Sequence, residues 1–237
     1  AQKAGGRIPE DAALLGEVAN LVETPYALLG SFEEAYLDLP APVLVTVLRK
    51  HQRCFPVEGP DGRLLPSFVA VANGDAIDLE TVRHGNEAVV RARFADAAYF
   101  WRQDLARPLA DFTPALAKLT FQVDLGSMLD KTARLTALAP RLAERLGVTA
   151  EDAASARRAA ELAKSDLATS MVVDFTSLQG VMGAEYARRA GEPEAVARAI
   201  LEHYLPRGGG DVLPESPAGI VLALADRLDS LVGLFAA

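Results

Sequence analysis

The sequence predicts an α+β protein that is predominantly α-helical, with a small mixed segment followed by an all-helical part. Alanine and leucine supply 43 and 33 of the 237 residues, and both lose little conformational freedom in helices. A strong turn signal at residues 58–62 separates two apolar runs, which is typical of a β-hairpin. Between residues 125 and 146, leucines recur at helical spacing. We therefore expect a mixed segment over residues 1–107 and a helical domain over residues 108–237.

The clearest element of the mixed segment is the hairpin. Its turn, EGPDG at residues 58–62, contains a proline that presets φ and glycines that accept positive φ. We predict its strands at residues 54–57 and 64–72. The β-branched run at residues 43–48 fits either a buried strand or the first turns of a helix, because so short a run shows no decisive period.

Helices are predicted from residue 78 onward, and several have recognisable ends. Asp111 and Thr113 are candidate caps for a helix near residue 110. Gly147 is placed as a C-cap, and Thr149 with Asp152 resembles a capping box that starts the next helix. The predicted helical segments are residues 86–103, 108–120, 125–146, 149–168, 177–190, 194–204 and 217–235.

Charge and composition exclude several classes of protein. The 24 basic and 32 acidic residues give a net charge of −8, which argues against nonspecific coating of nucleic acid. Residues 47–107 hold nine bases and eight acids, so an anionic partner fits this middle third best, although a solvated mixed surface would look the same. The single Cys54 excludes a disulfide framework and fits a reducing cytoplasm. We predict neither a membrane span nor a signal peptide.

Asp166, His203, Asp226 and Asp229 are the residues most suggestive of a metal site. They lie on three of the predicted helices, and the last two carboxylates are almost one turn apart. A hydrolytic metal centre needs several imidazoles and carboxylates that converge around an open position for water. With only three histidines in the chain, ordinary helix-packing polar residues are the alternative.

Basic residues suggest a different kind of site. Residues 49–53 read RKHQR, a run that can grip phosphate groups or simply lie solvated at the entry to the hairpin. Arg91 and Arg93 belong to a longer basic series, but two residues apart they cannot share one helix face. The chain has no Gly-x-Ser-x-Gly nucleophile motif and no phosphate-binding P-loop. These residues alone indicate a binding or interaction module.

Eight collinear blocks carry a resemblance to a known family. The chain resembles the β subunit of bacterial-type glycyl-tRNA synthetase from about residue 18 onward. The blocks are LVETPYALLGSFEEAYLDLP (21–40), KHQRCFPV (50–57), DGRLLPSFVAVAN (61–73), GNEAVVRARFADAAYFWRQDL (85–105), FQVDLGSMLDKTARLTALA (121–139), AKSDLATSMVVDFTSLQGVMGAEYARRAGE (163–192), AILEHYLPRGGGDVLPES (199–216) and ALADRLDSLVGLF (223–235).

This resemblance implies a glycine–tRNA ligase of class II with α2β2 composition, acting in the cytoplasm in protein biosynthesis. The α subunit would bind ATP, Mg²⁺ and glycine and carry out the adenylation, whereas the β subunit would bind tRNA-Gly and assemble with α. The family's β chain is longer than this one, so the sequence resembles an internal fragment without the C-terminal anticodon-binding region. For the fragment alone, the resemblance implies no catalysis, no metal and no cofactor.

The helical half also resembles an HD domain, the fold of many metal-dependent phosphohydrolases. When this sequence is aligned with the HD pattern, Lys131 stands at the position of the first histidine, and Ser165 and Asp166 stand at the His-Asp pair. His203 lies near the position of a later histidine, and Asp226 matches the final aspartate. A lysine repels a divalent ion and a serine replaces imidazole poorly, so we expect a degenerate HD domain. Lys131 would then contact a phosphate or, our preferred alternative, pair with Asp166 or Asp226.

The resemblance leads to a set of expected tRNA contacts and to two rival functions. One rival is a working HD phosphohydrolase that binds a metal, and the other is a purely structural module that docks other parts of the enzyme. The residues expected to contact the tRNA backbone are Arg49, Lys50, Arg53, Arg91, Arg93, Lys131 and Arg207.

Overall fold

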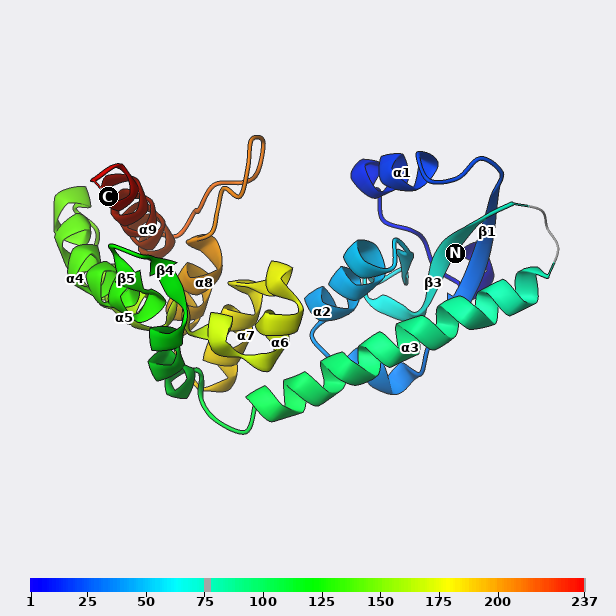
Figure 1. Cartoon of the computed structure of the whole chain (residues 1–237), viewed down its shortest axis with the longest axis horizontal. Helices are drawn as coiled ribbons and strands as arrows, with labels where there is room; N and C mark the ends of the chain where they lie inside the picture. The colour runs from blue at the N-terminus through cyan, green and yellow to red at the C-terminus, as the bar shows by residue number, and fades with distance from the viewer. Residues whose placement is uncertain (75–77, 237) are drawn as a thin grey trace. The chain divides into compact units, whose positions relative to one another are not determined.

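The computed structural model describes residues 1–74 and 78–236, and it divides into two compact units, Ala1–Trp101 and Arg102–Ala237. Figure 1 shows a small sheet with short helices in the first unit and a helical assembly in the second. The fold class expected from the sequence is confirmed, because helices predominate and strands are confined almost entirely to the first unit. None of the helices in the described part of the chain combines the length and apolarity needed to cross a membrane.

The first unit contains a three-stranded antiparallel sheet with the order β1–β3–β2. The predicted hairpin is confirmed, since β2 (Phe55–Glu58) pairs with β3 (Leu64–Asn73) in the register Phe55↔Val69. The third strand, β1 (Pro25–Ser31), was not predicted from the sequence. It pairs Gly30 with Phe68, and a Cβ on Gly30 would collide with the phenyl ring.

Short helices surround this sheet. The run whose structure the sequence left open is helical, forming α2 (Ala41–Thr46) and then a π-helical turn, η3 (Val47–His51). The remaining elements are the 3₁₀-helices η1 (Gln2–Ala4) and η2 (Glu34–Asp38) and the helix α1 (Ala12–Ala19).

Two apolar layers hold the first unit together. One layer joins Leu14 and Val18 of α1 to Phe55, Val57 and Val69 of the sheet. On the other side, α3 (Leu79–Asp104) contributes Phe94, which is fully buried and packs edge-to-face on Phe32 at 4.9 Å between ring centroids. Aromatic pairs in this geometry add stability beyond the area they bury.

The second unit is built from packed helices. In this unit, α5 (Ala150–Leu162) and α9 (Pro217–Ala236) pack on each other, and both contact α4 (Met128–Leu146) and α8 (Glu194–Glu202). The helix α7 (Val181–Arg189) packs on α8. Shorter pieces connect them. These are η4 (Leu109–Lys118), β4 (Thr120–Gln122), β5 (Gly126–Ser127), η5 (Ser165–Ala168), α6 (Ser170–Asp174) and η6 (Thr176–Leu178).

Local signals gave some helix ends correctly and others wrongly. Gly147 does end α4 in the left-handed conformation, and the Thr149 side chain accepts from the Asp152 backbone N–H at the start of α5. The predicted caps Asp111 and Thr113 are wrong, since η4 begins after Pro108 without a side-chain cap. The helix predicted to continue to residue 168 ends at Leu162, because η5 and α6 follow it as separate turns.

Candidate functional site

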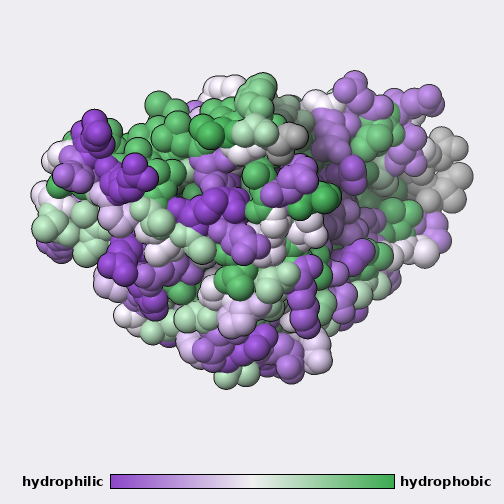
Figure 2. Space-filling model, turned by 60° about the vertical axis from the view of Figure 1, so that its left-hand side comes forward, coloured by the Kyte–Doolittle hydropathy of each residue, from purple (hydrophilic) through white to green (hydrophobic). Residues whose placement is uncertain are grey.

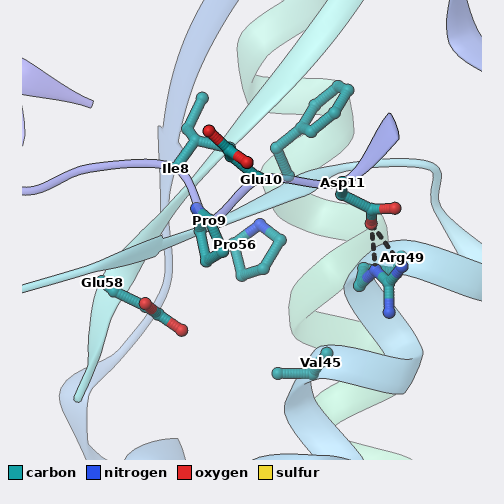
Figure 3. Close-up of a pocket in the computed structure, with 9 residues that line it drawn as sticks. Ile8, Pro9, Glu10, Asp11, Val45, Arg49, Pro56 and Glu58 are labelled. Atoms are coloured by element: carbon teal, nitrogen blue, oxygen red, sulfur yellow. Dashed lines mark hydrogen bonds and ion pairs between the residues drawn. The ribbon is translucent and has the colours of Figure 1, made fainter. Parts of the chain in front are cut away.

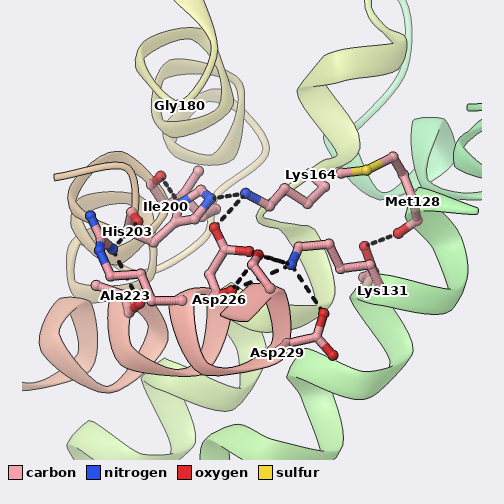
Figure 4. Close-up of polar contacts among 12 residues, drawn as sticks. Met128, Lys131, Lys164, Gly180, Ile200, His203, Ala223, Asp226 and Asp229 are labelled. Carbon is pink, nitrogen blue, oxygen red and sulfur yellow. Dashed lines mark hydrogen bonds and ion pairs between the residues drawn. The ribbon is translucent and has the colours of Figure 1, made fainter. Parts of the chain in front are cut away.

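Four side chains from four segments of the helical unit meet at one buried cluster. Lys131 lies on α4, Lys164 follows α5, His203 directly follows α8, and Asp226 lies on α9. Figure 4 shows both lysines reaching toward Asp226. We call these residues, together with Asp229, the lysine–aspartate cluster.

Asp226 is paired with both lysines. Lys131 Nζ lies 2.9 Å from Asp226 Oδ1, and Lys164 Nζ lies 3.0 Å from Oδ2. Only 3% and 4% of the two lysine side chains are exposed. Burial alone would raise the pKa of Asp226, but the neighbouring charges, with Lys164 first, hold that pKa well below its ordinary value. The Asp226 carboxylate is therefore ionised, and its negative charge offsets the positive charge of the two buried ammonium groups.

Asp229 completes the surroundings of Lys131. Lys131 Nζ is 3.0 Å from Asp229 Oδ2, and it also donates to Ser230 Oγ at 2.8 Å. Arg134 Nε donates to the other Asp229 oxygen, Oδ1, at 2.6 Å. The ring of Phe121 lies 4.4 Å from Lys131 Nζ, in cation–π geometry. Lys131 thus has several internal partners and very little access to solvent.

His203 is a neutral member of the cluster. Its Nδ1 lies 2.6 Å from the Ile200 carbonyl oxygen and must donate there, which leaves Nε2 to accept from Lys164 Nζ at 2.8 Å. Complete burial and the charge of Lys164 lower the pKa of His203 to about 3. Burial likewise lowers the pKa of Lys164, against the opposing charge of Asp226.

The Ser165–Asp166 pair makes different contacts. Ser165 Oγ hydrogen-bonds to Thr113 Oγ1 at 2.7 Å, so the predicted capping residue binds another segment instead. Asp166 Oδ2 accepts from the backbone N–H groups of Gly180 and Gly183, at 2.6 and 3.2 Å. Burial raises the pKa of Asp166 to about 6. Of the two carboxylates expected as partners of Lys131, the structure pairs it with Asp226.

The charged groups of the lysine–aspartate cluster favour internal ion pairing over metal binding. A divalent cation beside Asp226 would face two ammonium groups at hydrogen-bond distance, and its binding would be opposed by their charge. Within residues 1–74 and 78–236, no group of three or more His, Cys, Asp or Glu side chains has the arrangement of a metal site.

Sequence reasoning missed Lys164. The HD pattern pointed to Ser165 and Asp166, whereas the side chain next to Asp226 comes one residue earlier. The only signal was a lysine directly preceding Ser165, at the end of a helix predicted to continue further. The path of the backbone from α5 into η5 decides whether residue 164, 165 or 166 faces α9. The amino-acid composition does not reveal that path.

In the first unit, acidic residues at the N-cap of α1 and within α1 pair with two of the three cations in the basic run. Arg49 forms an ion pair with Asp11, at the edge of a cavity of about 180 Å³ that Ile8, Val45 and Glu58 also line (Figure 3). Arg53 Nε donates to Glu17 Oε1 at 2.7 Å. Opposite charges from α1 therefore already occupy two of the predicted phosphate-binding guanidinium groups.

The other expected tRNA contacts differ in how available they are. Arg91 Nε lies 2.6 Å from Glu33 Oε1, and Arg207 Nε lies 2.8 Å from Asp211 Oδ2. Lys50 and Arg93 are exposed and form no ion pair with any other residue that the structure describes. Lys131 is committed to the lysine–aspartate cluster. Only Lys50 and Arg93 of the seven thus present an exposed charge with no acidic partner among the described residues.

Comparisons with known proteins point to one family. The sequence model described as "Glycyl-tRNA synthetase beta subunit" matches residues 1–237. The glycine–tRNA ligase β subunit of Desulforudis audaxviator is 57% identical over 230 residues, which are 97% of this chain and 33% of that protein. The corresponding protein of Moorella thermoacetica is 50% identical over 237 residues, covering 100% of this chain and 34% of the relative. The chain thus spans about a third of the length of the curated relatives it matches.

Proposed function

Because the chain belongs to the glycyl-tRNA synthetase β subunit family, we propose that it is part of a cytoplasmic glycine–tRNA ligase. In this proposal it contributes to tRNA-Gly binding and to assembly with a catalytic α subunit, in an α2β2 enzyme that uses ATP to glycylate tRNA. ATP and Mg²⁺ would be bound by α. Family membership over the whole chain is the single observation that carries this proposal.

The helical module, residues 108–237, is proposed to be an HD-like scaffold that works without a metal. Its support is the lysine–aspartate cluster, in which Lys131 and Lys164 place positive charge on both oxygens of Asp226. Asp166, the aspartate of the presumed His-Asp pair, instead binds backbone N–H groups at the start of α7. These contacts favour a scaffold over the rival metal-dependent phosphohydrolase.

For tRNA contact through the first unit, the favoured residues are Lys50 and Arg93. A phosphate can approach an exposed cation directly, but at Arg49 or Arg53 it must first displace Asp11 or Glu17. Each phosphate contact releases condensed counterions and steepens the salt dependence of affinity. The paired arginines remain secondary candidates, because exposed ion pairs are weak.

Salt-dependent binding of tRNA-Gly to the assembled enzyme tests this assignment. The double variant K50A/R93A is compared with R49A/R53A, which removes the same number of positive charges from the same unit. The slope of log K against log salt is negative, and we expect K50A/R93A to reduce its magnitude by about one to two. R49A/R53A should reduce this magnitude less. If K50A/R93A leaves both affinity and slope unchanged, the proposed contact surface is wrong.

A further inference from the structure

The outer face of α9 carries a continuous apolar stripe. Leu224, Leu228, Leu231 and Phe235 follow one another at spacings of four, three and four residues, which places them on one side of the helix. Their exposed fractions are 37%, 41%, 56% and 89%. We call these four residues the α9 stripe. It covers about three helical turns, roughly 16 Å.

The charged residues of this part of α9 all have partners within the helical unit. Between Leu224 and Phe235 the charged residues are Asp226, Arg227 and Asp229, and all three are engaged within the unit. The two aspartates bind Lys131, while Arg227 donates to backbone carbonyls that include those of His203 and Pro206. A helix face exposed to solvent normally carries charged or polar side chains, so the α9 stripe has the composition of a buried helix face.

An apolar groove continues the stripe along the first half of α9. It has a volume of about 330 Å³, and its lining includes Leu205, Leu213, Ile220 and Leu224, together with Arg227, whose guanidinium donates to backbone carbonyls of the same unit. Leu213 is itself 66% exposed. Hydrophobic side chains gather over the upper part of the helical unit in Figure 2. Contiguous exposed apolar surface of this kind is typical of an interaction site.

We propose that the α9 stripe docks an amphipathic helix from the part of the β-subunit polypeptide that lies outside this segment. Two observations select this occupant. The curated relatives are about three times as long as the matched region, so the family has ample further polypeptide within one chain. The four-three-four spacing of exposed apolar side chains matches the seam of two packed helices. This inference rests on family membership and not on tRNA binding.

Thiol labelling of a full-length β subunit tests the proposal. The chain offers a favourable background, because its one cysteine, Cys54, is buried and burial raises its pKa to about 12. L231C introduces a reactive thiol into the stripe, and E151C places a control thiol on the exposed first turn of α5. Maleimide modification of each variant is followed by intact-mass spectrometry, both in the 237-residue chain and in the full-length subunit, with the unsubstituted proteins as blanks.

We expect both thiols to react at similar rates in the 237-residue chain. In the full-length subunit, L231C should react at least tenfold more slowly than E151C. Equal rates in the full-length subunit would overturn the proposal. Protection of L231C in the 237-residue chain alone, lost on dilution, would also overturn it, since a second copy would then be the occupant. Sedimentation of both variants shows that any difference in rate comes from folded protein.

Discussion

At Asp226, one carboxylate is shared by two buried ammonium groups, and this is the most demanding arrangement of charges in the helical unit. Each lysine loses its hydration on burial, and only short ion pairs and hydrogen bonds offset that cost. Lys131 has Asp229 and Ser230 as further partners, and Lys164 has His203. Neutralising Asp226 would therefore leave excess positive charge on two lysine side chains that are almost completely buried.

We predict that D226N lowers the free energy of unfolding by about 3 kcal/mol or more, because breaking a buried ion pair leaves an uncompensated charge. The measurement is urea denaturation at neutral pH. D211N is the matched control, since it breaks an ion pair with Arg207, whose side chain is 68% exposed. That loss should be much smaller than the loss in D226N, because solvent screens the exposed pair. Equal effects of the two substitutions would show that the lysine–aspartate cluster does not stabilise the unit.

Sequence reasoning succeeded at Lys131, for which two alternatives were open, a phosphate contact and an internal ion pair. The preferred alternative is found in the structure, because Lys131 pairs with Asp226. It failed for Lys164, because the path of the backbone decides which of residues 164–166 reaches Asp226, and the sequence does not give that path. It also failed to anticipate that α1 would supply acidic partners to Arg49 and Arg53.

At the scale of elements, Asp166 shows how a carboxylate organises a helix start. Its Oδ2 accepts from the backbone N–H groups of Gly180 and Gly183, around the first turn of α7. A Cβ at Gly183 would crowd this oxygen, and Gly180 has a φ of +78°. The close approach depends on both glycines.

Asp166 also predicts a pH dependence of stability. The folded-state pKa is raised to about 6 from 3.8, so the folded protein binds this proton more tightly than the unfolded chain does. The resulting stability is fully present below pH 3.8 and is lost as pH rises through 6. The substitution D166N puts a neutral side chain of the same shape at this position, so the free energy of unfolding no longer falls as this group ionises. The free energy of unfolding of D166N relative to the parent should therefore increase by about 2 kcal/mol between pH 4 and 6.5.

Chemical denaturation across this pH range provides the measurement, and the shape of the difference curve decides the outcome. A constant offset between the two proteins would reflect packing or hydrogen bonding and is subtracted. A flat or falling difference would contradict the raised pKa of Asp166.

Elements defined by neighbouring residues could be predicted, whereas those defined by distant partners could not. The hairpin follows from its turn, and the end of α4 follows from Gly147. In contrast, β1 is a strand because it pairs along β3, some forty residues later. The five-residue helix α6 starts where Asp104, from α3, accepts from the backbone N–H groups of Ser170 and Met171. Neither contact leaves a local signal.

At the scale of the whole molecule, family membership was predictable because it depends on the order of many blocks rather than on one motif. Net acidity alone argued against a nucleic-acid partner. The proposed tRNA role is compatible with that acidity if contact is local, since Lys50 and Arg93 are exposed cations while the neighbouring Arg49 and Arg53 are paired with acidic residues. Local contact with tRNA requires only a few such residues.

The central claim is that this segment handles tRNA and leaves the chemistry to the α subunit. It is tested most directly by steady-state kinetics of the assembled enzyme carrying K50A/R93A, with glycylation and glycine-dependent ATP–pyrophosphate exchange measured in parallel. We predict a roughly tenfold loss of kcat/KM for tRNA, from the loss of about 1.4 kcal/mol of binding, with pyrophosphate exchange unchanged. An equal loss in both reactions, or no loss in either, would contradict the claim.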